Sequence, residues 1–189
     1  MENEIKLRDA IFSLHTRKFG SVVEVLVEKI LKEFEFLVER PKDLSYDRKI
    51  NGLKDEIKGS RVLSKSVLDL NTDNLVETLL AHESHRFVNL SGDTKIHWDC
   101  NIQQIKTPLF NTLWYVLFFG DCVAVFKIAS DKIVQDKNIS YSNKQHRGNE
   151  GEGQFHVNEK NIKYHLENYL VKTITYKEVY EKLSKKLGS

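Results

Sequence analysis

The stretch 46-YDRKINGLKDEIKGSR-61 decides the fold, because it places a turn signal between two short segments with strand character. Asn51-Gly52 tolerates the positive φ angles of a two-residue hairpin turn. We therefore predict that residues 45–48 and 53–59 pair as antiparallel neighbours. Such a hairpin would fix the register of every charged side chain in the stretch.

The predicted hairpin brings two carboxylates and one ammonium group to one place. Alternation along the second strand points Glu56 and Lys58 to the same face and Ile57 to the other, and pairing carries Asp47 close to Glu56. Two carboxylates repel each other unless a cation lies between them, and hard oxygen ligands with open water positions suit Mg²⁺. Lys58 would position or help deprotonate an attacking water. The residue types therefore predict metal-dependent hydrolysis of a nucleic-acid backbone, and the competing interpretation is an ordinary charged surface hairpin.

Length and composition describe an ordinary globular chain. The 189 residues, 22.0 kDa, 40% apolar and 30% charged residues predict a single domain over residues 1–189 that needs neither disulfides nor metals to hold its core. No stretch approaches the roughly 20 apolar residues of a membrane span. The amino-terminal residues lack the plan of a signal peptide. We expect a soluble, cytoplasmic protein.

Hydrophobic periodicity and capping signals outline the other elements of an α/β fold. Together they predict a three-layer αβββαβ core with a mixed sheet and extra C-terminal helices. The predicted helices cover residues 4–14, 21–38, 71 or 72 to 82, 108–119, 162–171 and 176–187, and the predicted strands beyond the hairpin lie within 95–106 and 121–129. Thr107 and Pro108 stand at the predicted start of the fourth helix, and Thr175 and Glu178 have capping-box spacing at the start of the last.

Asp47 and Glu56-Ile57-Lys58 together resemble the motif of the PD-(D/E)xK nuclease superfamily, and more narrowly that of a small type II restriction endonuclease. The resemblance covers about residues 21–129. It implies the αβββαβ core, a Mg²⁺ cofactor and a metal site at Asp47, Glu56 and Ile57, with Lys58 as the catalytic group beside them. Tyr46 replaces the proline that often precedes the first aspartate, and this leaves Asp43, after Lys42, as a rival first carboxylate.

The resemblance also implies supporting residues around the motif. Family members often add a glutamate from the preceding helix, a role that Glu24 matches and that Glu28, one turn later, could equally take. Gln104 and Lys106 lie on the third predicted strand, where polar residues of this superfamily can border the site.

DNA contacts are expected from two polar segments. Residues 40–66 carry eight basic against four acidic residues, although a solvated lysine-rich surface has the same appearance. Residues 140–154 form a long polar connection with three glycines, which is typical either of a DNA-reading element or of a surface loop. Side chains suited to base edges or phosphates in these segments are Asn143, Lys144, Gln145, Arg147, Asn149 and Arg61.

The resulting functional hypothesis is a Mg²⁺-dependent, sequence-specific endonuclease that cuts double-stranded DNA. One chain offers one site, so cutting both strands requires a homodimer or a larger heterodimer in which this chain is the catalytic subunit. Two alternatives remain at this level: a structure-specific resolvase or nicking nuclease of the same superfamily, and a DNA-binding module without catalysis.

Overall fold

The computed structural model describes residues 2–33, 37–41, 45–65, 72–73, 75–76, 86–92, 95–144 and 150–184. Its helices are α1 (Glu2–Ser13), α2 (Thr16–Glu33), α4 (Ser130–Gln135), α5 (Ile162–Asn168) and α6 (Tyr176–Ser184), with 3-10 turns η2 (Thr107–Leu109) and η3 (Lys137–Ile139). Its strands are β1 (Val38–Glu39), β2 (Arg48–Ile50), β3 (Leu53–Arg61), β4 (Asp99–Ile105), β5 (Thr112–Phe118), β6 (Cys122–Ala129), β7 (Ser142–Lys144), β8 (Glu150–Asn158) and β9 (Leu170–Thr175). No helix in these ranges is long and apolar enough to span a bilayer.

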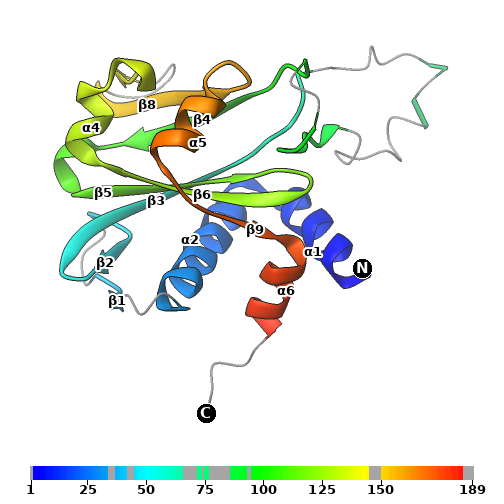
Figure 1. Ribbon diagram of the computed structural model, residues 1–189, viewed down its shortest axis with the longest axis horizontal. Coiled ribbons are helices and arrows are strands. Elements are labelled where there is room, and N and C mark those ends of the chain that lie inside the picture. The colour runs from blue at the N-terminus through cyan, green and yellow to red at the C-terminus, as the bar shows by residue number, and fades with distance from the viewer. Residues whose placement is uncertain are drawn as a thin grey trace.

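A six-stranded mixed sheet in the order β1-β2-β3-β5-β6-β9 forms the middle layer (Figure 1). The predicted hairpin turn is confirmed: Asn51 and Gly52 have φ angles of 48° and 85°, and Arg48 lies opposite Asp55 in the antiparallel ladder. The first strand of the hairpin, predicted over residues 45–48, is instead Arg48–Ile50. β3 and β5 run parallel, and every other neighbouring pair in this sheet is antiparallel. β3 therefore lies between two neighbours, which fixes both its register and the faces of its side chains.

Three helices cover one face of this sheet. α2 buries a stripe at three- and four-residue spacing, including Val23, Leu26, Val27 and Ile30, and joins α1 and α6 in one apolar cluster with the sheet. Figure 1 shows these three helices below the sheet. A Cβ atom at Gly59 would lie 2.6 Å from a methyl carbon of Val23, so a glycine lets α2 approach β3 closely.

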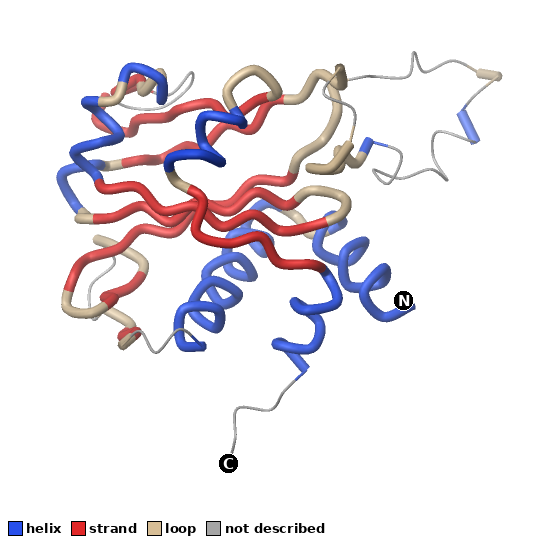
Figure 2. The backbone as a smooth tube through the Cα atoms, viewed as in Figure 1, coloured by secondary structure: helices blue, strands red, loops and turns tan. Residues whose placement is uncertain are grey.

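The other face of the sheet carries a second sheet in the order β4-β8-β7, together with α4 and α5 (Figure 2). The inward side chains of β4 and β8 are apolar and share a second buried cluster with β5 and β6, in which Ile102, Phe155, Tyr115 and Phe126 are among the fully buried members. The protein is thus an α/β structure with three layers: helices, a mixed sheet, and a smaller sheet with two short helices.

The helix predicted over residues 108–119 is wrong, because this segment is strand β5. The Thr107-Pro108 signal opens only the 3-10 turn η2, which ends at Leu109. All seven residues of β5 are buried, since the strand lies between the two apolar clusters. A strand covered on both faces reads as a continuous apolar run, and its length and composition resemble those of a buried helix.

The predicted αβββαβ order is therefore wrong as well. The third predicted strand exists as β4, but it belongs to the second sheet instead of the mixed sheet. The polar segment expected to connect elements contains β7 and β8, and the helix expected over 162–171 ends at Asn168, where β9 follows. Thr175 and Glu178 do form the predicted capping box, with reciprocal hydrogen bonds of 2.8 and 3.2 Å. The helix predicted up to residue 82 falls largely outside the described residues.

Substituting Gly59→Ala tests the close contact between α2 and β3. The added methyl must displace Val23, so we expect the free energy of unfolding to fall by about 1–3 kcal/mol. Gly20→Ala is the matched control: nothing lies within 4 Å of a Cβ there, and alanine in the helix interior should add about 0.5–1 kcal/mol. Urea unfolding of both variants measures the difference, and a Gly59→Ala variant as stable as the unchanged protein would contradict the packing.

Candidate active site

Asp47 is held at the start of the hairpin by two hydrogen bonds to β3. Its main-chain N–H donates to the carbonyl of Asp55 at 3.1 Å, and its carboxylate Oδ2 accepts from the N–H of Ile57 at 2.8 Å. The strand that carries Glu56 thus orients the Asp47 carboxylate directly. The hairpin brings the two acidic residues together although they are nine positions apart in the sequence.

Glu56 and Lys58 project from the same face of β3, as the alternation predicts. Their side chains form an ion pair of 2.5 Å, and only 13% of Glu56 and 23% of Lys58 is exposed. An ammonium group has three donors, and the contact with Glu56 uses one of them. The pair is therefore positioned by burial and still presents polar atoms to the space in front of it.

Asp47, Glu56 and Lys58 line one hollow of about 220 Å³ between the two sheets. This volume has room for several waters or a hydrated ion. An isolated antiparallel bridge joins Ser64 to Trp98, and β4, which begins at Asp99, contacts β3. The hollow is lined by Ser45, Asp47, Glu56, Lys58, Gln104, Lys106, Leu109, Phe110 and Glu152.

The second sheet supplies the opposite wall of this hollow. Gln104 and Lys106, which the sequence resemblance placed beside the motif, line this hollow, and Lys106 forms an ion pair of 2.9 Å with Glu152 on β8. Glu152 and Ser45 were not predicted. The polar residues that alternate with buried ones along β8 were the available signal for Glu152, but the glycines beside it favoured a loop.

Burial and neighbouring acidic groups raise the pKa of Glu56 and of Glu24. Burial raises the pKa of Glu56 first, and the negative charges of Asp47 and Glu24 raise it further, while Lys58 lowers it. The pKa of Glu24 is raised by its partial burial and by Asp47, against the opposing effects of Arg48 and Lys58. The carboxylates of Glu24, Asp47 and Glu56 are therefore close enough to repel one another, and a bound cation would reduce this repulsion.

Glu24 and Glu28 have different surroundings, which separates two residues that the sequence left equivalent. Arg48 is buried between them, 3.3 Å from Glu24 and 3.0 Å from Glu28. Glu28 also pairs with Lys32 at 2.7 Å, and although burial opposes it, these cations lower its pKa. Glu28 thus holds Arg48 in place, while the pKa of Glu24 depends on the charges of Asp47 and Lys58.

The donor set fits a hard divalent cation. Among the residues that the structure describes, no three His, Cys, Asp or Glu side chains gather into a metal-binding group. Mg²⁺ is commonly held by one or two carboxylates and completes its shell with water, which is the arrangement that Asp47 and Glu56 offer. The side chain of Ile57 is buried in the α2 cluster, so only its main chain could contribute.

The residues predicted to bind DNA are not gathered at one place. Asn143 and Lys144 lie exposed on β7, the edge strand of the second sheet, and they do not line the hollow. Arg61 donates hydrogen bonds to the carbonyls of Phe12 and Leu14 and so holds the end of α1. Gln145, Arg147 and Asn149, and the rival carboxylate Asp43, lie outside the described residues.

Comparison of the chain with protein-family models, curated proteins and solved structures gives no match. The interpretation of the hollow therefore depends on its own residues and their geometry.

Asp55 is a second unusual carboxylate, on the opposite face of β3 from Glu56. It is buried, its Oδ1 accepts from the indole N–H of Trp114 at 3.2 Å, and burial raises its pKa to about 6 in spite of hydrogen bonds from Trp114 and Thr112. Its place under the helix layer excludes it from the hollow. Sequence patterns gave no signal for this residue.

The raised pKa of Asp55 predicts a pH-dependent stability. Because the folded state binds its proton more tightly than the unfolded chain, the contribution is present below pH 4 and lost as pH rises through about 6. Relative to Asp55→Asn, the unchanged protein should lose about 2 kcal/mol of unfolding free energy between pH 4 and pH 7.

Asp121→Asn serves as the control of opposite sign. Burial opposes the ionisation of Asp121, but hydrogen bonds from Ser91 and Leu90 outweigh it and lower the pKa. The free energy of unfolding of Asp121→Asn should therefore be lower than that of the unchanged protein at neutral pH, and this difference should shrink at acid pH. Chemical denaturation at several pH values measures both differences, and parallel pH profiles for the Asp55→Asn variant and the unchanged protein would contradict the assignment.

Proposed function

We propose that this chain is a divalent-metal-dependent endonuclease that hydrolyses DNA phosphodiester bonds. Its site would be of the PD-(D/E)xK type, although the order of its elements differs from the predicted αβββαβ core. The observation that carries the proposal is that Asp47, Glu56 and Lys58 line one hollow, with the two acids joined to the same strand. The motif alone recurs by chance in charged sequences, and convergence of its three side chains in space is a much narrower condition.

The residues divide the chemistry among themselves. Asp47 and Glu56 would hold Mg²⁺, and the ion supplies Lewis-acid chemistry to the hydrolysis when bound. Lys58 keeps its ammonium group beside Glu56 and directs its other donors to an attacking water or to a phosphate oxygen. Glu24 and Arg48 act behind this site, since they change its charge without lining it.

One site per chain determines the assembly that the proposal requires. A duplex has two strands of opposite polarity, so double-strand cleavage needs a second site related by symmetry or supplied by a partner. The proposal therefore includes either a homodimer or a larger heterodimer in which this chain is the catalytic subunit, acting at a specific sequence.

Substituting Lys58→Ala should abolish most cleavage while the fold persists. Loss of the ammonium removes the positioning of water and the stabilisation of phosphate charge, so we expect Mg²⁺-dependent cleavage of plasmid DNA to fall by about a hundredfold or more. Gel electrophoresis of supercoiled, nicked and linear products measures the rate.

Lys127→Ala is the matched control for this experiment. Lys127 lies on β6 of the same sheet, and its ammonium group stacks over Trp114 on the opposite face. The Lys127→Ala variant should therefore cleave DNA at the unchanged rate. Equal rates for Lys58→Ala and the unchanged protein, or cleavage that persists in EDTA, would refute the proposed mechanism. Preferential cleavage of branched over linear DNA would favour a resolvase, and binding without any product would favour a DNA-binding module.

A further inference from the structure

The hollow has a wall that the nuclease motif does not supply. Gln104 and Lys106, at the end of β4, and Glu152, on β8, face Asp47 and Glu56 across it. β4 and β8 belong to the second sheet, whereas β3, which carries Glu56 and Lys58, belongs to the six-stranded sheet. The two walls thus come from two different sheets.

Gln104 reaches this wall through an unusual backbone conformation. It has a φ of 59°, in the left-handed region that non-glycine residues rarely adopt, and the β4–β8 register shifts between Gln103 and Ile105. A bulge of this kind redirects side chains, and such strain persists where the surroundings require it. Here both Gln103 and Gln104 are exposed while Ile105 remains fully buried in the core.

The side chain of Lys106 lines the hollow and is partly exposed to solvent. Its ammonium is 2.9 Å from Glu152, and 47% of its side chain is exposed. An ion pair this exposed adds little to stability, so stability alone gives little reason for its position. The ammonium can direct other donors to an anion without leaving Glu152.

The charges of the hollow favour a phosphodiester once a metal ion is bound. Three acidic side chains, Asp47, Glu56 and Glu152, face two basic ones, Lys58 and Lys106. A divalent cation changes this net charge from minus one to plus one. A single phosphodiester group then neutralises the hollow.

We propose that Gln104 and Lys106 bind one phosphodiester of a DNA strand and position it beside Asp47, Glu56 and Lys58. We call these two residues, which lie on the second-sheet side of the hollow, the positioning wall. This inference rests on the proposed nuclease function and adds to it how the substrate strand is held. Lys106 contributes charge and Gln104 a directed amide donor, and neither takes part in the proton transfers.

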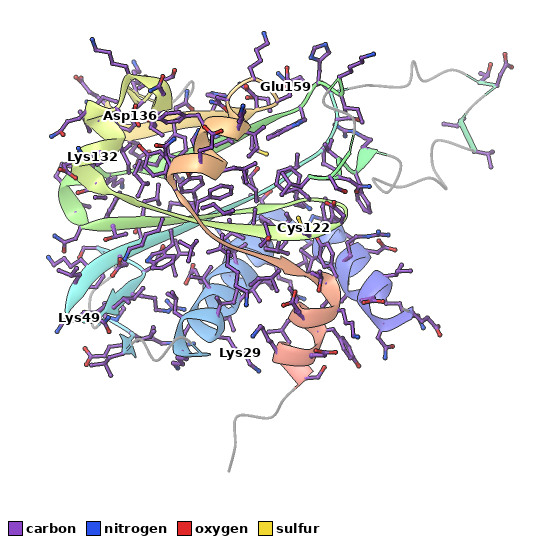
Figure 3. The ribbon with its side chains drawn as sticks, in the orientation of Figure 1. Lys29, Lys49, Cys122, Lys132, Asp136 and Glu159 are labelled. Carbon is purple, nitrogen blue, oxygen red and sulfur yellow. The ribbon has the colours of Figure 1, made fainter. Side chains whose placement is uncertain are left out.

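The charge contribution is tested with Lys106→Met, Lys106→Arg and the control Lys49→Ala. Lys49 belongs to the basic stretch 40–66, but it does not line the hollow, and it is similarly exposed and paired with Glu39. It lies at the lower left of Figure 3, whereas the second sheet is at the top of that view. Binding of a fluorescent duplex is measured in Ca²⁺ over a range of salt concentrations, and cleavage kinetics in Mg²⁺. We expect Lys106→Met to weaken binding about five- to tenfold, to lower the slope of log K against log salt by about one, and to raise KM more than it lowers kcat.

The matched variants separate a local contact from general electrostatics. Lys106→Arg should keep most of the affinity, and Lys49→Ala should keep the full salt slope. An unchanged slope in Lys106→Met, or an equal loss in Lys49→Ala, would overturn the positioning wall while leaving the nuclease proposal intact. A chain that neither binds nor cuts DNA would overturn both.

Gln104→Gly tests whether the side chain of Gln104 contacts DNA or only shapes the bulge, because DNA affinity should change only in the first case. Glycine relieves the positive φ, so the thermal midpoint should rise by about 2 °C. DNA affinity should nevertheless fall about threefold or more, because the amide is lost. A rise in the midpoint with unchanged affinity and KM would show that Gln104 only shapes the bulge, and would overturn its part of the proposal.

Discussion

The hydrogen bond from the Ile57 N–H to the Asp47 carboxylate is the contact on which the site depends. It joins the residue before the hairpin to the strand after it, and it exists only because the Asn51-Gly52 turn sets the register between β2 and β3. A slip of one residue would turn Glu56 and Lys58 into the helix layer and Asp55 toward the hollow. One short turn thus determines which carboxylate faces the second sheet.

Burial on both faces of the mixed sheet makes this register difficult to change. β3 has α2 on one side and β4 on the other, with Gly59 permitting the close approach of Val23. The acidic residues of β3 are consequently divided: Asp55 is enclosed beside Trp114, and Glu56 opens into the hollow. The rigid layers position the charged groups, and the negative charges of Asp47 and Glu24 raise the pKa of the buried Glu56, an effect that the proposed cation would offset.

The hairpin, the capping box at Thr175 and the convergence of Asp47, Glu56 and Lys58 could be predicted from local signals, because turn chemistry and period-two alternation act over a few residues. The identity of β5 could not, since its seven buried residues have no polar face to reveal a period. The sequence also could not predict that β4 belongs to a second sheet, because β4 pairs with β8, which lies far along the chain. That missed sheet is what hid Glu152 from the predicted site.

The most direct test of a shared cation at Asp47 and Glu56 is anomalous diffraction from crystals soaked in manganese. The account predicts a single strong peak in the hollow, within about 2.0–2.2 Å of a carboxylate oxygen from each residue, and loss of that peak in a Glu56→Gln variant. A peak elsewhere on the protein, or a hollow in which the two carboxylates point apart and hold no ion, would contradict it.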